Sequence, residues 1–426
     1  MAFLRLPSSA AVVLTMCSCR PVHELQRGPF ALRPVVGYSA HRDVLMGRLP
    51  VSQGERHSAE AVRATRAVVD LSAVRHNISG IRQRIGVGRH LMAVVKADGY
   101  GHGALQVSEA ALSGGADCLA VAIPEEGREL RDKGIVCPIL VLGLIQPSEA
   151  GKSVGAALEQ TVCSVDLLDA LDRESQNRGV KTMVHIKLDT GMGRIGLAPE
   201  DVVGFARRVA ACPGLVLKGL FSHFSCADES DKAFSHAQLR RFNEVVQALD
   251  AAGIAIPVKH MANSAAVLDL PEAHLDMVRP GIMIYGLYPS AEVSHSVDLR
   301  PAMSFLTRVC HVKDVAAGTP IGYGAIYVTP EEKRIATIPV GYADGYRRNL
   351  TGKAEVIVRG TRVPIVGRVA MDMCMLDVTS VPDAREGDDV ILFGAGLPVE
   401  EMASLIGTIN YEVVTCIGKR VPRQYI

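Results

Sequence analysis

Short apolar segments alternate with amphipathic stretches between residues 67 and 298. The apolar segments are rich in Val, Ile and Leu, and such runs are typical of strands buried on both faces of a parallel sheet. They predict strands at residues 67–71, 91–95, 118–122, 139–142, 161–165, 183–188, 217–223, 258–261 and 275–278. The amphipathic stretches predict helices at residues 72–85, 104–112, 125–133, 165–177, 199–210 and 232–252.

The order and number of these segments indicate the fold class. Eight predicted strands follow the first within roughly 200 residues, which suits a (β/α)8 barrel. A doubly wound open sheet is the alternative, but the count and the length favour the barrel. Ser72 is a plausible N-cap for the first helix. We therefore predict an α/β fold with a TIM-like barrel over residues 65–298.

Near residue 299 the helical periodicity disappears, and alternating segments separated by turn residues take over. They predict strands at residues 303–312, 334–340, 354–358, 361–369, 374–378, 390–393 and 412–417, with one helix at residues 399–406. This pattern is typical of a second, mostly-β domain, which we place at residues 299–426.

Residues 1–64 differ from the rest of the chain, because they are rich in arginine and contain no lysine. They are expected to be a disordered extension, a targeting peptide or residues added by an upstream start codon. The net charge of +1 indicates no basic face for nucleic acid. No apolar run approaches the roughly 18 residues of a spanning helix, so no membrane partner is expected. The cysteines lack metal-type spacing, which favours a cytoplasmic protein without a metal, although the leader leaves export or organelle import open.

The chemistry centres on the segment Val-Val-Lys-Ala-Asp-Gly-Tyr-Gly-His-Gly-Ala that ends at Ala104. Lys96 stands at the C-terminal end of a predicted barrel strand, where such barrels keep their catalytic groups. Burial there lowers the pKa of an ammonium group, so the free amine can attack an aldehyde. A lone lysine at a strand end is more often a surface residue. The whole segment, however, resembles the pyridoxal-phosphate lysine motif of the alanine racemase family, V-K-A-(D/N)-(G/A)-Y-G-H-G.

The resemblance runs from about residue 67 to the C-terminus, and it implies a pyridoxal-phosphate enzyme that interconverts L- and D-alanine for cell-wall peptidoglycan. It also implies that the first strand pairs in the β domain. Further matching segments are His-Met-Ala-Asn-Ser ending at Ser264, Val-Arg-Pro-Gly-Ile ending at Ile282, and Ile-Asn-Tyr-Glu around Tyr411. The family positions that bind the cofactor correspond to Lys96, Tyr100, His223, Ser264, Arg279, Gly281, Ile282 and Tyr411. Each of these alone has an ordinary structural explanation, such as an N-cap for Ser264 or a turn for Gly281.

Three basic residues have particular roles in the family. Arg279 matches the arginine that faces the pyridine nitrogen, and its permanent charge disfavours protonation of that nitrogen, which makes the ring a weaker electron sink. Arg194 matches the arginine that donates to the phenolic oxygen of the cofactor. Lys187 matches a lysine that many members carbamylate, and we expect carbamylation because two adjacent bare cations would be costly.

Racemisation requires proton carriers on opposite faces of the α-carbon, and one lysine serves only one face. Tyr323, between two glycines, resembles the tyrosine base of the family. A free tyrosine has a pKa near 10, so it needs positive charge nearby, which His223 and Arg279 would match. The positions that line the entrance and hold the substrate carboxylate correspond to Tyr342, Met371 and Asp372. In the family, this tyrosine and these entrance residues come from the partner subunit, so a homodimer with composite sites is implied.

Related functions remain alternatives. Many members have cysteine where this chain has Ala370, so a serine racemase or a broad-specificity racemase is the nearest rival. A decarboxylase of the same fold would place an acidic residue rather than Arg279 at the pyridine nitrogen. A pyridoxal-phosphate homeostasis protein consists of the barrel alone, and the β domain argues against it.

Overall fold

The computed structural model describes residues 63–426, and the leader expected over residues 1–64 lies almost entirely outside them. Eight parallel strands form a closed barrel, as predicted. They are β2 (His90–Val94), β3 (Cys118–Val121), β4 (Ile139–Val141), β5 (Glu159–Val162), β6 (Thr182–Lys187), β7 (Leu215–Phe221), β8 (Val258–His260) and β9 (Met277–Val278). Most of their residues are buried, because the barrel interior and the helices cover both faces.

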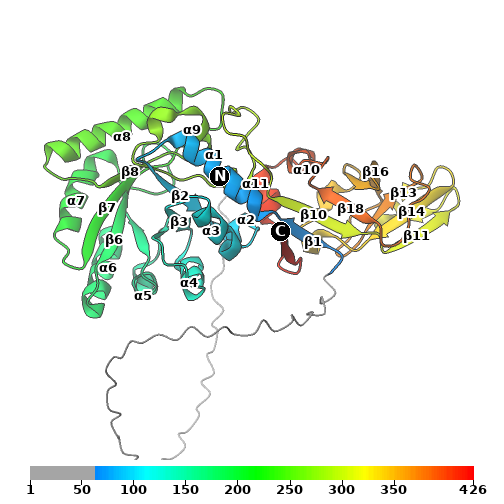
Figure 1. The fold of residues 1–426 in the computed structure, drawn as a ribbon, viewed down its shortest axis with the longest axis horizontal. Coiled ribbons are helices and arrows are strands. Elements are labelled where there is room, and N and C mark those ends of the chain that lie inside the picture. The colour runs from blue at the N-terminus through cyan, green and yellow to red at the C-terminus, as the bar shows by residue number, and fades with distance from the viewer. Residues whose placement is uncertain (1–62) are drawn as a thin grey trace, which may run out of the picture. The chain divides into compact units, whose positions relative to one another are not determined.

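Helices surround these strands (Figure 1). They are α1 (Leu71–Ile85), α3 (Ala104–Ser113), α4 (Pro124–Asp132), α5 (Ala150–Gly155), α6 (Val165–Arg178), α7 (Val202–Ala210), α8 (Ala233–Ala251) and α9 (Ser264–Asp269). The expected N-cap of α1 is wrong: Asp70 is the cap, and its carboxylate accepts from the backbone N–H groups of Ser72 and Ala73. An aspartate caps as well as a serine, and here it stands one residue before the helix.

The β domain is built on a nine-stranded sheet in the described chain, with the order β11-β14-β17-β16-β15-β18-β10-β1-β19. These strands are β1 (Arg66–Val69), β10 (Met303–Arg308), β11 (His311–Val315), β14 (Lys333–Ile338), β15 (Glu355–Val358), β16 (Thr361–Val366), β17 (Cys374–Asp377), β18 (Asp389–Phe393) and β19 (Arg423–Tyr425). The first strand, β1, pairs antiparallel with β10 and parallel with β19. The N-terminal strand thus joins the sheet of the C-terminal half.

Two predictions in this half are wrong. Residues 303–312 form two strands rather than one, since β10 pairs with β18 and β11 pairs with β14. Residues 412–417 were expected to form a strand, but helix α11 (Asn410–Thr415) occupies this region, after the correctly predicted α10 (Val399–Ile406). The β-branched residues Val413 and Val414 favour a strand locally, but both are buried in the helix, so tertiary packing overrides propensity.

Helix α11 is important for the site because it packs against α2 (Lys96–Tyr100), the segment that begins with the motif lysine. The guanidinium of Arg423 also donates to the carbonyl oxygen of Gly101 over 3.0 Å between Nε and O. The β domain therefore supports the lysine loop directly. Over residues 63–426, no helix has both the length and the apolar character needed to cross a membrane.

Candidate active site

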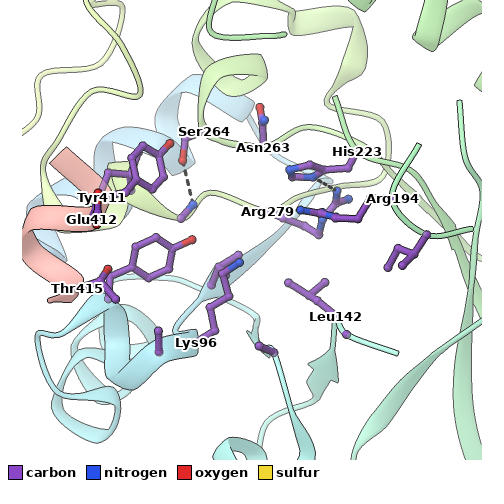
Figure 2. A pocket seen from close by; sticks show the side chains of 18 of the residues that line it. Lys96, Leu142, Arg194, His223, Asn263, Ser264, Arg279, Tyr411, Glu412 and Thr415 are labelled. Atoms are coloured by element: carbon purple, nitrogen blue, oxygen red, sulfur yellow. Dashed lines mark hydrogen bonds between the residues drawn. The ribbon is translucent and has the colours of Figure 1, made fainter. Parts of the chain in front are cut away.

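A cavity of about 800 Å³ opens at the C-terminal ends of the barrel strands, and Figure 2 shows most of the side chains that line it. Ten residues predicted for the site lie together around this cavity: Lys96, Tyr100, Lys187, Arg194, His223, Ser264, Arg279, Gly281, Ile282 and Tyr411. Nine of them lie at or after the ends of barrel strands, which the closed barrel brings to one end, and Tyr411 comes from α11 of the β domain. This is the end at which barrel enzymes carry their catalytic groups.

Lys96 begins an unusual turn. The backbone from Ala97 to Gly101 has positive φ at every residue, with φ of 53° at both Ala97 and Asp98. Left-handed conformations of this kind cost of order 1–3 kcal/mol at a non-glycine residue. Glu126 stabilises the turn, because its Oε1 accepts from the N–H of Ala97 at 2.7 Å. Such strain persists only where the surroundings impose it, and it fixes the direction of the lysine.

Two further contacts hold this loop. The carboxylate of Asp98 accepts from the N–H of Ala104, with 2.9 Å between Oδ1 and N. The ring of His102, which is completely buried, lies with its Nδ1 3.0 Å from the carbonyl oxygen of Tyr100. A side chain at Gly101 would place its Cβ 2.4 Å from the carbonyl oxygen of Val414, so only glycine fits against α11. The motif therefore encodes the shape of the loop as well as the lysine.

The surroundings of Lys96 favour its uncharged amine. Burial lowers the pKa of its ammonium group, and the positive charge of Arg194 lowers it further, while Glu126 acts in the opposite direction. A lower pKa increases the fraction of free amine near neutral pH. Lys96 can therefore act as a nucleophile and as a proton carrier.

Three residues after β8 and β9 form a compact set of polar groups. The hydroxyl of Ser264, at the start of α9, accepts from the N–H of Gly281 with 2.9 Å between Oγ and N. Gly281 is bare because a Cβ there would lie 2.5 Å from the hydroxyl oxygen of Tyr100. Ile282 follows in the short helix η4 (Ile282–Tyr285). A hydroxyl, backbone amides and nearby phenols are suitable ligands for a phosphate group.

Arg279 is buried beside two histidines. Its Nη1 donates to Nδ1 of His260 at 2.9 Å, and its Nη2 lies 3.4 Å from Nδ1 of His223. Its Nη2 also donates to the carbonyl oxygen of Ser222 at 2.7 Å. Burial lowers the pKa of Arg279 to about 9, so its guanidinium still carries a positive charge at neutral pH. Burial, followed by the charge of Arg279, lowers the pKa of both histidines well below the usual range, so both rings are neutral.

Lys187 ends β6 inside the barrel and is only 3% exposed. Its ammonium donates to the carbonyl oxygen of Leu188 at 2.8 Å. Burial lowers the pKa of Lys187 to about 8, with a further contribution from Arg279. The described part of the chain provides no carboxylate bonded to this amine, so its charge has little compensation.

Four predicted residues do not line the cavity: Tyr323, Tyr342, Met371 and Asp372. They lie in the β domain and are exposed, with Tyr323 74% and Met371 52% exposed. Tyr323 occupies a short 3-10 turn between β12 (Pro320–Ile321) and β13 (Tyr327–Val328). Within one chain, the predicted lysine and the predicted tyrosine are therefore not brought together.

The loops that carry three of these residues, Tyr342, Met371 and Asp372, are held around one buried charge. The carboxylate of Asp344 accepts from Arg63 at 2.6 Å and from Arg420 at 2.7 Å. Arg420 also reaches Asp372, with 2.7 Å between Nη2 and Oδ1. Burial raises the pKa of Asp344, but the bonds from both arginines outweigh this and lower it. Tyr342 begins the 3-10 turn that ends at Asp344, so one network positions both segments.

Sequence reasoning missed several groups at the site. Among them, Asn263, Phe221, Thr415 and Cys416 line the cavity, and His260 bonds to Arg279. Phe221 and His260 end barrel strands, so their position at a strand end was a usable signal. Thr415 and Cys416 lie in and just after α11, which was expected to be a strand, so their approach to the cavity had no signal in the sequence.

Comparison with known proteins gives a consistent result. Residues 69–289 match the model of the alanine racemase N-terminal domain, and residues 302–425 match that of the C-terminal domain. The chain is 48% identical over 361 residues to an alanine racemase from Desulfovibrio desulfuricans, which covers 84% of this chain and 97% of the relative. An alanine racemase from Desulforamulus reducens is 49% identical over 364 residues, covering 84% of this chain and 98% of the relative.

Solved structures agree with these sequence matches. An alanine racemase from Clostridium difficile 630 superposes with a TM-score of 0.83 at 38% identity, covering 86% of this chain and 97% of that one. The alanine racemase from Bacillus anthracis with bound L-Ala-P superposes with a TM-score of 0.81 at 38% identity, covering 86% of this chain and 96% of that one.

Proposed function

The chain belongs to the alanine racemase family, and from this premise we propose that it interconverts L- and D-alanine with Lys96 of one protomer and Tyr323 of the partner subunit as the two proton carriers. The observation that carries the proposal is the position of Lys96, whose amine is directed into the barrel cavity from a strained turn. We propose a cytoplasmic enzyme that supplies D-alanine for cell-wall peptidoglycan. Its working parts are the barrel of residues 65–298 and the β domain of residues 299–426.

The residues around the cavity fit pyridoxal phosphate, the cofactor of this family. Ser264, Gly281 and Ile282 would hold the phosphate. The phenol of Tyr100 lies beside Gly281, and Figure 2 shows the phenol of Tyr411 beside Ser264. Gly281 leaves room for the hydroxyl of Tyr100, because a Cβ at this position would lie 2.5 Å from that oxygen. Arg279 would face the ring nitrogen. When bound, the cofactor acidifies the hydrogen on the α-carbon of the amino acid.

The remaining phenols of the cavity are poor candidates for the second base. Burial raises the pKa of Tyr100 and of Tyr411 well above that of a free tyrosine. A base with a pKa so far above the working pH is almost entirely protonated. The second proton carrier must therefore come from elsewhere, and the sequence motif points to Tyr323.

Large apolar side chains are exposed in the part of the β domain that carries Tyr323, and they support the idea that a second copy of the chain covers this surface. The surface consists of Tyr323, Ile326, Tyr342, Met371 and Met373, all of which are exposed. Several large apolar side chains exposed in one domain are consistent with an interface between proteins. We propose that a head-to-tail homodimer places this surface at the cavity of the partner subunit, so that each site uses residues from both chains.

In such a site, each residue has a defined task. Lys96 would hold or release a proton at its Nζ on one face of the α-carbon, and Tyr323 of the partner subunit would do so at its hydroxyl on the other face. The permanent charge of Arg279 would limit electron withdrawal by the ring, which favours simple return of the proton. The backbone amide of Met371, with Tyr342 and Asp372 at the entrance, would hold the carboxylate of the substrate.

A mixing experiment tests the shared site. Dimers of Lys96→Ala chains and dimers of Tyr323→Phe chains are each expected to be nearly inactive. After the two are mixed and allowed to exchange subunits, each heterodimer should contain one intact site, and racemisation of L-alanine should recover. Recovery proportional to the heterodimer fraction, measured by native mass spectrometry, is the expected result. Heterodimers without activity would contradict a site built from two chains.

We further propose that Lys187 is carbamylated. Its pKa of about 8 leaves a useful fraction of free amine near neutral pH, and that amine can add carbon dioxide with release of a proton. The product is an anion beside Arg279 and near Arg194, which removes the cost of adjacent cations. In carbon-13 bicarbonate, a carbamate resonance should appear in the wild type and be absent from Lys187→Asn. Its absence from the wild type would contradict the modification.

A further inference from the structure

A chain of buried hydrogen bonds crosses the barrel from Arg279 to its opposite end. Arg279 bonds to Nδ1 of His260, and Nε2 of His260 lies 2.9 Å from Nδ1 of His185. Nε2 of His185 lies 3.0 Å from Oε2 of Glu159, whose other oxygen lies 3.1 Å from Nζ of Lys218. Both histidine rings are fully buried, so neither exchanges these partners for water.

The far end of this chain is at the N-terminal end of the barrel. Glu159 begins β5, and it lines a second cavity of about 200 Å³ together with Lys218, His185 and the first residues of several other strands. The side chain of Lys218 is 36% exposed, whereas that of Glu159 is 10% exposed. The carboxylate is therefore largely covered, and its lysine partner reaches toward solvent.

Glu159 at one end of the chain of hydrogen bonds and Arg279 at the other determine which ring nitrogen of His185 and His260 carries a proton. A carboxylate only accepts, so His185 carries its proton on Nε2 and leaves Nδ1 bare. Burial raises the pKa of Glu159, but the hydrogen bond from His185 and the charge of Lys218 outweigh it, so the pKa is lowered and the group stays ionised. Burial lowers the pKa of His185, so that ring is neutral, and His260 must donate from its own Nε2. Nδ1 of His260 is then bare, which suits Arg279, since a guanidinium only donates.

The surroundings are shaped to hold both rings. A Cβ at position 219 would lie 2.2 Å from Nδ1 of His185, so Gly219 leaves room for this ring. The register of β6 against β7 shifts between Val184 and His185, at the same place. The ring of Phe221 stacks on His260 with 4.9 Å between centroids and 7° between planes. Neither ring can turn freely, and each keeps one set of partners.

We propose that Glu159 is a positioning residue for Arg279, which it reaches through His185 and His260, by imposing the single proton arrangement in which His260 accepts from the guanidinium. Without this anchor, His260 can carry its proton on Nδ1, which would then oppose Arg279. Glu159 touches neither substrate nor cofactor in this arrangement. The expected effect on catalysis rests on the proposed function. The positions of the protons on His185 and His260 can be measured without any assay of activity.

The test uses the holoenzyme with nitrogen-15-labelled histidine, because protonated and bare ring nitrogens resonate far apart. In the wild type, both His185 and His260 should show a protonated Nε2 and a bare Nδ1. Glu159→Leu should change the nitrogen signals of His260, which lies two hydrogen bonds away from Glu159. It should also lower kcat roughly ten- to hundredfold, as the loss of residues that position ligands does in metal sites. Glu159→Gln should lose less, since its amide oxygen still accepts.

Controls separate positioning from folding. Lys218→Met keeps the carboxylate and should leave both histidines in the wild-type pattern. Glu174→Leu is the matched control, because it deletes a half-buried carboxylate of α6 that takes no part in the chain of hydrogen bonds. Unchanged His260 signals in a folded Glu159→Leu holoenzyme would overturn the proposal. A protonated Nδ1 on either histidine in the wild type would overturn it without any variant. If the wild type shows the expected protonation of both histidines but does not racemise alanine, the result contradicts the proposed function and leaves the positioning role intact.

Discussion

Replacing Lys96 with alanine is expected to lower racemisation of alanine by about four orders of magnitude or more, since in the proposed site this one residue is both the attachment point of the cofactor and a proton carrier. The variant should also lose pyridoxal phosphate on dialysis more readily than the wild type. Initial rates in both directions and the cofactor absorbance retained after dialysis measure these two effects.

The matched control is Lys133→Ala, which removes a lysine at the end of α4 that lines no part of the cavity. It should keep full activity and cofactor. The thermal midpoint of the Lys96→Ala apoprotein should stay close to that of the wild-type apoprotein, because removal of a half-buried ammonium costs the fold little. Activity above one-tenth of the wild type in Lys96→Ala would contradict the role of this residue.

The features predicted best from sequence are those that leave a local, repeated pattern. The barrel strands were recognised because each is a short apolar run, and Lys96 was placed because it stands at the end of one of them. The turn that directs it was not predicted, since positive φ at Ala97 and Asp98 is imposed by Glu126 and α11 rather than by local preference. Helices α5 and α9 have six residues each, too few for a clear period.

Contacts between residues far apart in the chain could not be predicted from the sequence. His185, His260 and Glu159 lie on three different strands, and nothing local indicates that their side chains meet inside the barrel. The same holds for α11, where a β-branched run suggested a strand although packing against α2 makes it helical. The resemblance identified Arg279, whereas its hydrogen-bond partners became visible only in three dimensions.

Replacing Tyr323 with phenylalanine removes one hydroxyl from an exposed side chain, and we expect racemisation to fall by a factor of about 10² to 10⁴. Folding stability should change by no more than about 0.5 kcal/mol, because the change lies on the surface of the single chain. The control is Tyr327→Phe, a neighbouring tyrosine in β13 that is half-buried and assigned no role in the site. It should retain wild-type rates.

The Tyr323→Phe variant should also differ in how fast each enantiomer of alanine exchanges its α-proton with solvent. Because the two enantiomers of free alanine have equal energy, the loss of Tyr323 must lower kcat/KM equally in the two directions. Exchange with heavy water need not be symmetrical, since Lys96 still serves one face of the α-carbon. One enantiomer should therefore exchange its α-proton without inversion, and the other should exchange far more slowly. Equal, rapid exchange of both enantiomers in Tyr323→Phe would show that another group carries the second proton.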